Sequence, residues 1–226
     1  MSARPTRLHF IRHAEVATPY HRVFAGRLDI PLSDRGRHQA QALRHCLTRL
    51  APDAVYASPM LRVQQTLEPW LHNGGPVPVR CPELREVDFG QWTGVAWDEV
   101  EPRFGQSPWD WLALLEQNAI PGAEPFEVFR NRVATCLDRI LWAHPGADVA
   151  VVCHGGVIRM ALAWLCRWPL AATAVLAIDY ASLTRVAVHN PRVEIELLNG
   201  LPWQQEPWNP RPAHRSRPGS ARLPPA

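Results

Sequence analysis

The chain has 226 residues, of which 46% are hydrophobic, so it can bury the core of one large domain or of two small ones. Its formal net charge is +3, and all 24 of its basic residues are arginine. The absence of lysine excludes a P-loop ATPase, whose lysine contacts the phosphates, and pyridoxal or Schiff-base catalysis, which needs a lysine amine.

The first half of the chain alternates predicted strands and helices. Residues 8–11 form a short apolar run that predicts a buried strand. Ser33 is a good N-cap, and the leucines after it recur at helical spacing up to Pro52. Residues 54–57 predict a second strand, followed by a helix that we expect to begin at Pro59 and to end at residues 74–76. Residues 91–123 are irregular and rich in tryptophan.

The second half continues the alternation. A long amphipathic helix is predicted over residues 126–141, and a fully apolar strand over residues 148–153. The two glycines Gly155 and Gly156 turn the chain into a helix from Val157 to about Trp168, and closing strands are expected at residues 176–180, 184–188 and 193–198. This order predicts an α/β fold, a three-layer α/β/α sandwich around a mostly parallel sheet.

The cysteines and the apolar runs indicate the cellular compartment of the protein. The five cysteines, which are odd in number, contain no CxxC pair, so neither a disulfide framework nor a zinc ribbon is expected. Residues 8–11 are too short for a signal peptide, and no run approaches the ~18 apolar residues of a membrane span. We therefore expect a cytoplasmic protein without a membrane partner.

The C-terminal residues 203–226 differ from the rest of the chain. They hold four arginines, one glutamate and six prolines, and so carry the whole net charge of +3. We expect one domain over residues 1–202 and a disordered or loosely draped tail after it. A basic tail could contact nucleic acid, but four arginines over twelve residues favour a plain solvated terminus. No nucleic-acid partner is therefore expected.

Polar side chains follow three of the predicted strands. Arg12 and His13 follow the first strand, Arg62 lies just beyond the second, and His154 follows the strand that ends at Cys153. Because ligands bind beyond the carboxyl ends of strands in an open α/β sheet, these side chains should meet at one edge. Each residue alone is more simply a structural or surface residue. Together, with a helix N-terminus after His154, they predict an anion site that suits a phosphoryl group.

Five linked motifs resemble the histidine phosphatase superfamily, the phosphoglycerate-mutase-like fold with the Arg-His-Gly signature. They lie, in the expected order, at residues 11–15, 29–36, 57–66, 84–92 and 152–155, and the resemblance covers about residues 7–200. It implies that residues 91–123 form a helical or irregular cap insertion over the pocket. It also implies a phosphatase that needs neither a metal nor another cofactor.

The resemblance also implies roles for individual residues. His13 would attack phosphorus and form a phosphohistidine. Arg12, Arg62 and His154 would hold the equatorial oxygens, with Gly155 beside them, and His154 also counts as catalytic. Glu86 would protonate the leaving oxygen and then activate water. Taken alone, Glu86 would more simply form a salt bridge with an arginine such as Arg85.

This sequence departs from the family pattern at several positions. Ala14 stands where the signature has glycine, and it would cost roughly 1 kcal/mol or more if that position needs a positive φ. Pro19 and Ala25 replace an asparagine and a glutamine of the mutases, and Thr93 replaces a frequent glutamate. These changes bear on the substrate more than on the phosphoryl chemistry.

The cap region limits the substrate. Residues 91–123 contain one basic residue, Arg103, against five acidic ones, together with five aromatic residues. One interpretation is that these rings pack the cap onto the sheet. The scarcity of basic partners also argues against a second phosphate or a carboxylate. A monophosphate with a neutral or aromatic leaving group is favoured. Residues 118–129 look similar to alpha-ribazole phosphatases of cobalamin nucleotide-loop assembly, so alpha-ribazole 5'-phosphate is the leading candidate.

Three alternatives stay open. The chain could be a broad-specificity phosphatase, a phosphoglycerate mutase-type phosphotransferase, or a catalytically inactive protein that binds a phosphorylated ligand. In each case the partner is a small phosphomonoester. The oligomeric state is open as well, with a homodimer as one candidate.

Overall fold

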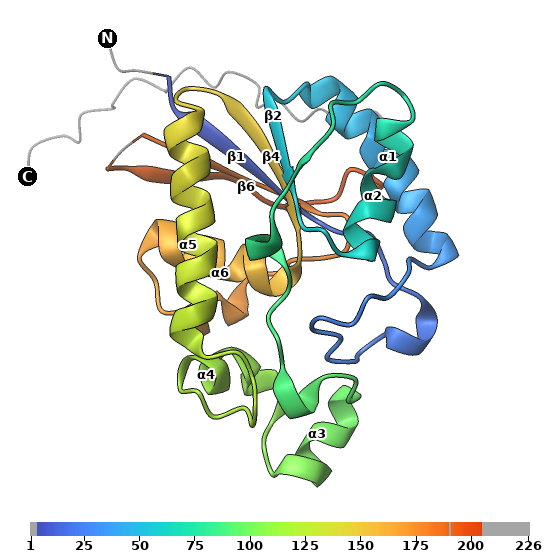
Figure 1. Ribbon diagram of the computed structural model, residues 1–226, viewed down its shortest axis with the longest axis vertical. Coiled ribbons are helices and arrows are strands. Elements are labelled where there is room, and N and C mark those ends of the chain that lie inside the picture. Colours follow the sequence, from blue (N-terminus) through green and yellow to red (C-terminus); the bar gives the residue numbers. More distant parts are fainter. Residues whose placement is uncertain (1–3, 190, 205–226) are drawn as a thin grey trace, which may run out of the picture.

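A six-stranded mixed sheet forms the centre of the computed structural model, which describes residues 4–189 and 191–204 (Figure 1). The strand order is β3-β2-β4-β1-β5-β6. Strands β1, β2, β3 and β4 run parallel to one another, whereas β5 pairs antiparallel with both β1 and the edge strand β6. The bounds are β1 Thr6–Arg12, β2 Ala54–Ala57, β3 Val79–Arg80, β4 Asp148–Cys153, β5 Leu183–Val188 and β6 Val193–Gly200.

Helices cover both faces of this sheet, which confirms the predicted three-layer α/β/α fold (Figure 1). Helices α1 (Asp34–Leu50) and α2 (Leu61–Leu71) pack on one face, against side chains such as Ile11 and Val152. Helices α5 (Phe126–Ala143) and α6 (Gly155–Cys166) pack on the other, against Leu8 and Phe10. Because successive strand residues point to opposite faces, β1 supplies both cores.

The cap region contains two short helices at one end of the molecule, α3 (Trp97–Phe104) and α4 (Trp111–Glu116) (Figure 1). Its aromatic residues divide into two groups. Trp92 is fully buried and joins the main core, as packing of the cap onto the body requires. Trp97 and Trp111 are partly buried, and they both pack against this core and line a cavity.

Several predicted boundaries hold and others need correction. Ser33 caps α1, since its side chain accepts a hydrogen bond from the N–H of Gly36 at 2.9 Å. Helix α2 begins at Leu61 rather than at Pro59, because Met60 is its N-cap and the preceding backbone is extended. Helix α6 begins earlier than predicted, at Gly155.

Residues 176–180 do not form the predicted strand. The chain runs there as an irregular segment after a short 3-10 helix, Leu170–Val175. The carbonyl oxygens that strand pairing would use accept hydrogen bonds from side chains instead. Arg159 donates to Leu176 O at 2.8 Å, and Arg12 donates to Ile178 O at 2.6 Å. An apolar composition alone could not reveal these arginine contacts.

The predicted tail lies mostly outside the described residues, since the description stops at residue 204. Trp203, its first residue, is packed onto the body. Its indole N–H donates to Tyr180 O at 3.2 Å, and the Arg35 guanidinium lies 5.2 Å from the centre of its ring. Packed structure therefore extends one residue beyond the predicted boundary at residue 202. No described helix is long and apolar enough to cross a membrane.

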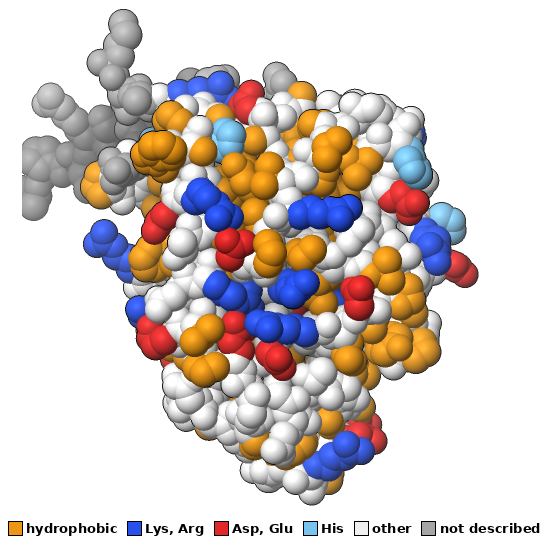
Figure 2. All heavy atoms as spheres, in the orientation of Figure 1, with side chains coloured by type: hydrophobic (Ala, Val, Ile, Leu, Met, Phe, Trp, Pro, Cys, Tyr) orange, Lys and Arg blue, Asp and Glu red, His pale blue; other side chains and the backbone are white. Residues whose placement is uncertain are grey.

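Basic and acidic side chains are interspersed on the face of the molecule that Figure 2 shows. Several basic side chains lie next to one another near the centre of this face, with acidic side chains beside them and hydrophobic ones around them. The exposed cap pair Arg103–Glu99 is one example of such local compensation. On this face, the even balance of charge in the body that the sequence predicts is also visible in space.

Candidate active site

His13 lies at the carboxyl end of β1 and is buried, with 4% of its surface exposed. Its Nδ1 is 2.8 Å from the carbonyl oxygen of Ala14. Since a carbonyl can only accept, Nδ1 carries the proton and Nε2 keeps its lone pair. Burial, together with Arg62 and Arg12, holds the pKa of His13 well below its ordinary range. The ring is therefore neutral at pH 7, as a nucleophile must be.

Arg62 lies on the first turn of α2 and is 2% exposed. Its Nε donates to His154 Nδ1 at 3.2 Å, and its terminal nitrogens donate to Leu28 O at 2.7 Å and to Gly26 O at 2.8 Å. A guanidinium has five N–H groups, so one remains on each terminal nitrogen. Burial lowers the pKa of Arg62 to about 10, which leaves the side chain charged at neutral pH.

Arg12 supplies a second guanidinium from the end of β1. It lies 4.0 Å from the centre of the Tyr180 ring, in a cation–π contact, and is held by its hydrogen bond to Ile178 O. Among the described residues its buried Nε has no hydrogen-bond partner. A buried N–H normally has one, so this donor is suited to an anion in the adjoining cavity.

His154 is fully buried behind these groups, with its ring centre 5.2 Å from that of His13. Its Nδ1 accepts from Arg62, so the neutral ring carries its proton on Nε2, which is 2.8 Å from Ser58 Oγ. Burial and the charge of Arg62 lower the pKa of His154 well below its ordinary range. Both nitrogens are thus engaged within the protein.

Glu86 reaches the site from the segment after β3. Its carboxylate accepts hydrogen bonds from the N–H of Gly156 at 3.1 Å and from the N–H of Val87 at 3.0 Å. A Cβ on Gly156 would lie 2.5 Å from Glu86 Oε1, so the carboxylate occupies space that only glycine leaves free. The alternative considered for Glu86, a salt bridge to an arginine such as Arg85, is not among the ion pairs of the described residues, and the carboxylate accepts from backbone N–H groups.

Most of these groups border one cavity of about 200 Å³. It is lined by Arg12, His13, Arg62, Glu86 and Gly155, but not by His154. The first turn of α6 forms one wall, and the positive end of a helix dipole favours an anion there. An aromatic wall also lines the cavity, with Phe24 from the loop before α1, Phe89 from the segment after β3, and Trp97 and Trp111 from the cap.

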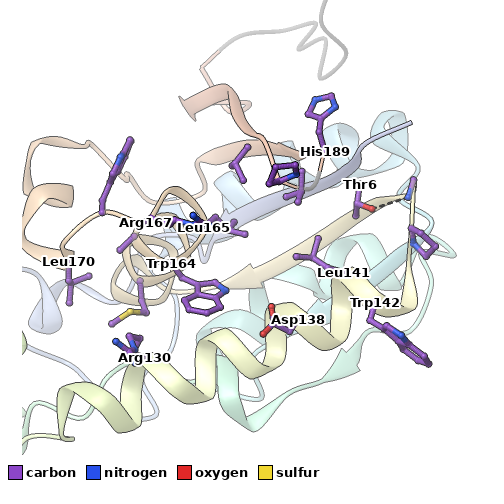
Figure 3. A pocket seen from close by; sticks show the side chains of 18 of the residues that line it. Thr6, Arg130, Asp138, Leu141, Trp142, Trp164, Leu165, Arg167, Leu170 and His189 are labelled. Carbon is purple, nitrogen blue, oxygen red and sulfur yellow. Dashed lines mark hydrogen bonds between the residues drawn. The ribbon is translucent and has the colours of Figure 1, made fainter. Parts of the chain in front are cut away.

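A larger cavity, of about 800 Å³, lies elsewhere, between α5, α6 and the β5–β6 hairpin (Figure 3). Trp142 borders it at one end and Arg130 at the other, with Asp138 and Trp164 between them (Figure 3). None of the residues that the strand ends deliver lines it. The larger cavity is therefore not the better candidate for the active site. The smaller cavity holds the convergent hydrogen-bond donors that a phosphoryl group needs.

Metal ligands are not gathered around the smaller cavity. Among the described residues, the group of three His, Cys or carboxylate side chains close enough to share an ion is Cys81, Glu83 and Cys136, and none of these lines it. Positive charge at the cavity comes from arginines.

The family model of the histidine phosphatase superfamily (branch 1) matches residues 8–200, which is most of the chain. The chain belongs to this superfamily. It is 30% identical over 199 residues to the adenosylcobalamin/alpha-ribazole phosphatase of Escherichia coli K12, covering 85% of this chain and 95% of that protein. It is 28% identical over 194 residues to phosphoserine phosphatase 1 of Hydrogenobacter thermophilus, covering 85% and 92%.

The fold agrees with solved structures of the same superfamily. A mycobacterial glucosyl-3-phosphoglycerate phosphatase superposes with a TM-score of 0.77 at 25% identity, over 87% of this chain and all of that one. The named relatives share phosphatase activity and differ in substrate. This histidine phosphatase is accordingly a phosphoric monoester hydrolase, as the motifs predicted.

The expected strain at Ala14 is absent from this histidine phosphatase. Ala14 does not belong to the described residues with positive φ, and its side chain is buried beside Leu32, Ala40 and Ala181. Its N–H donates to Thr66 Oγ1 at 2.9 Å. The backbone beside His13 is therefore held by ordinary hydrogen bonding and packing, and alanine carries no conformational penalty there.

Three residues of the site were missed by the sequence reasoning. Tyr180 stacks under Arg12 and lies 5.5 Å from the His13 ring, and Arg159 of α6 lines the cavity as a third guanidinium. Gly156 makes room for Glu86 and donates to it. Only Gly156 had a visible signal, since it follows Gly155 in a motif of which only the first glycine was assigned to the site.

Proposed function

We propose that this phosphatase works through a phosphohistidine on His13. The supporting observation is the neutral Nε2 of His13 in the same cavity as the unpartnered Nε of Arg12 and the free N–H groups of Arg62. Nε2 attacks phosphorus as the P–O bond to the leaving group breaks. Water then attacks the phosphohistidine, which releases inorganic phosphate and restores the imidazole.

Each charged group has a part in this proposal. Arg12 and Arg62 bind the equatorial oxygens, whose negative charge persists through the transition state. His154 positions Arg62 by accepting its Nε–H, so it is a positioning residue rather than a direct ligand of phosphate. Gly155 opens the helix whose positive end faces the same oxygens.

Glu86 is the general acid in this proposal. Its protonated carboxyl gives a proton to the leaving oxygen in the first step and takes one from water in the second. The two hydrogen bonds from Gly156 and Val87 fix the carboxyl at the cavity wall. Arg132 of α5 holds the backbone of this segment in place. It donates to the carbonyl oxygen of Arg85 at 2.7 Å and to that of Glu86 at 3.3 Å.

The leaving group of the proposed substrate is aromatic, with alpha-ribazole 5'-phosphate as the leading candidate. The aromatic wall supports this choice, because Trp97 and Trp111 line the cavity and can stack on a base. We also propose that the cap, residues 91–123, selects the substrate. The similarity to the Escherichia coli adenosylcobalamin/alpha-ribazole phosphatase points the same way. A screen of phosphate release over alpha-ribazole, nucleotide, sugar and amino-acid monophosphates tests the order of preference.

The proposed setting is the cytoplasm, with a small phosphomonoester as partner and neither nucleic acid nor membrane. All five cysteines are free thiols, as a reducing compartment allows.

The mechanism is tested with the full chain and two histidine variants. We expect His13→Ala to lose turnover of p-nitrophenyl phosphate by at least about 10³-fold, because the nucleophile is gone. His38→Ala, at an exposed position of α1, is the matched control and should keep it. The wild type should form an acid-labile, base-stable phosphoenzyme and be inhibited by vanadate but not by EDTA. Wild-type turnover by His13→Ala would contradict the mechanism.

Product analysis with the wild-type chain separates this phosphatase mechanism from the three alternative functions. A phosphotransferase of the mutase type would form 2-phosphoglycerate from 3-phosphoglycerate with a bisphosphate primer, and we expect no such product. A protein that only binds phosphorylated ligands would release no phosphate from any substrate. A broad-specificity phosphatase would show similar kcat/KM values for aromatic and aliphatic leaving groups.

A further inference from the structure

Two cysteines outside the cavity share a cluster with charged side chains. Cys81 follows β3, and Cys136 lies on the inner face of α5. Their sulfur atoms and a carboxylate oxygen of Glu83 all lie within 4.8 Å of one another. Arg139, one turn after Cys136, donates to Cys81 Sγ at 3.5 Å, to Cys136 Sγ at 3.7 Å and to Glu83 Oε1 at 3.1 Å. One guanidinium thus contacts both sulfurs.

These contacts make the two thiols unequal. Hydrogen bonding from Cys136 and the nearby charge of Arg139 lower the pKa of Cys81 to about 7, despite its burial. Its hydrogen bond to Cys81 and its own burial raise the pKa of Cys136. At neutral pH, Cys81 therefore has thiolate character while Cys136 stays protonated beside it. A thiolate beside a second thiol is the arrangement that reactive, reversible cysteine pairs use.

The cluster is shielded but lies close to the surface. Cys81 and Cys136 are 1% and 0% exposed. The side chains that contact the sulfurs and each other, Arg139 and Glu83, are 49% and 30% exposed. Both sulfurs therefore lie next to side chains that reach the solvent, on the path by which a small oxidant could approach them.

We propose that Cys81 and Cys136 are a reversible dithiol–disulfide site that reacts with small hydroperoxides. The Cys81 thiolate attacks one peroxide oxygen, the O–O bond breaks, and a sulfenic acid and hydroxide form. The Cys136 sulfur then attacks the Cys81 sulfur, which releases the sulfenic oxygen as water. In sum, two thiols lose two electrons and two protons to hydrogen peroxide, which becomes two waters. A dithiol reductant reverses the reaction.

The charge of the cluster favours this chemistry over a metal ion. The Arg139 guanidinium already supplies a positive charge to the three groups that would ligate a cation. A divalent ion among the same atoms would be repelled by it. A transient disulfide also fits a reducing compartment, where cysteine pairs serve for sensing rather than for permanent cross-links.

The bond would join two elements that meet next to the phosphatase site. Cys81 lies five residues before Glu86, and Arg132 of α5 already holds the carbonyl oxygens of residues 85 and 86. A Cys81–Cys136 disulfide would tie this segment to the same helix covalently. The proposal concerns the bond itself, so it stands or falls independently of the roles proposed for His13 and Glu86.

The test treats the full wild-type chain with an equimolar amount of hydrogen peroxide, then unfolds it in urea with iodoacetamide to block all free thiols, and digests it with trypsin. Cleavage after arginine places Cys81 on residues 81–85 and Cys136 on residues 133–139. We expect these two peptides to appear joined, at the sum of their masses minus two hydrogens, and to separate after treatment with dithiothreitol. In Cys136→Ser, which lacks the resolving thiol, Cys81 should instead be trapped as a sulfenic acid by dimedone.

Cys166→Ser is the matched control, because Cys166 is partly exposed and lies outside the cluster. It should form the Cys81–Cys136 bond as the wild type does. Wild-type chains in which both peptides remain carbamidomethylated after peroxide would overturn the proposal, and this measurement does not depend on a variant that folds. Retention of one zinc ion per wild-type chain, lost in Cys81→Ser, would overturn it in favour of a metal site.

Discussion

The carboxylate of Glu86 and the backbone of Gly156 occupy adjoining space, and this contact gives the sharpest test of the site. An alanine Cβ at Gly156 would lie 2.5 Å from Glu86 Oε1, whereas ordinary contacts begin near 3.4 Å. The carboxylate must therefore move by about 1 Å, the difference between these distances. Since it is the end of a flexible side chain, it can move without unfolding the protein. Gly156→Ala should damage function and spare stability.

The size of the functional loss follows from the displacement. A misplacement of 1 Å at a reacting group costs about 10²-fold in rate, which is about 2.7 kcal/mol of activation free energy. The two effects of Gly156→Ala on the free energy of unfolding nearly cancel. Alanine in a helix gains about 0.5–1 kcal/mol over glycine, and the hydrogen bond from the Gly156 N–H to a partly exposed carboxylate contributes a similar amount. The free energy of unfolding should therefore change by less than about 1 kcal/mol.

Gly155→Ala is the matched comparison on the same turn of α6. Its Cβ would lie 3.6 Å from the Arg12 guanidinium, an ordinary contact distance, and neither glycine has a positive φ. We expect Gly155→Ala to lose less than about tenfold in kcat/KM, mainly through KM. The assay compares an alkyl phosphate with p-nitrophenyl phosphate, since nitrophenolate leaves without a proton. Gly156→Ala should lose kcat mainly on the alkyl substrate. Equal losses on both substrates, or wild-type kcat on the alkyl phosphate, would refute the acid role of Glu86.

Two further predictions concern protonation and the aromatic wall. Burial lowers the pKa of three histidines, His9, His13 and His154, so the unfolded chain binds more protons than the folded one below about pH 6.5. The neutral histidines make their full contribution to the free energy of unfolding above about pH 6.5. Below that pH the free energy of unfolding falls by up to about 4 kcal/mol per pH unit. An equal free energy of urea unfolding at pH 7.5 and pH 5.5 would contradict this prediction. Trp97→Ala should raise KM about tenfold for a monophosphate with an aromatic base but not for phosphoserine, because stacking contributes on the order of 1–3 kcal/mol per base. Trp142→Ala, at an exposed position of α5, should change neither KM, and equal effects of Trp97→Ala on both substrates would remove the stacking argument.

The strand ends explain why much of the site could be predicted from the sequence. Arg12, His13 and His154 directly follow short apolar runs, and parallel strands bring their carboxyl ends to one edge. The register pairs Arg12 with Cys153, so the two histidines start from neighbouring positions. The short apolar runs therefore predict which distant residues meet, because few sheet topologies are compatible with this order of strands and helices.

The missed features all depend on contacts between side chains and distant backbone. Tyr180 lies in a segment whose apolar composition predicts a strand, and the hydrogen bonds that Arg12 and Arg159 donate to its carbonyl oxygens show why it is not one. Gly156 and Glu86 are 70 residues apart, and no local pattern links them. The hydrogen bonds of His154 to Arg62 and Ser58 could not be predicted either, because they join residues more than 90 positions apart in the sequence.

The distribution of charge around His13 explains why arginine suits this site in a chain without lysine. The positive charge that would bind a phosphoryl group is the same charge that lowers the pKa of the nucleophile, since Arg62 and Arg12 both act on His13. A lysine in so buried a position could lose its proton, whereas Arg62 stays charged even with its pKa lowered to about 10. The arginines can therefore remain cationic while His13 remains neutral, at the same pH and within one cavity. An anionic substrate then brings its own charge to Arg12, whose buried Nε has no other described partner.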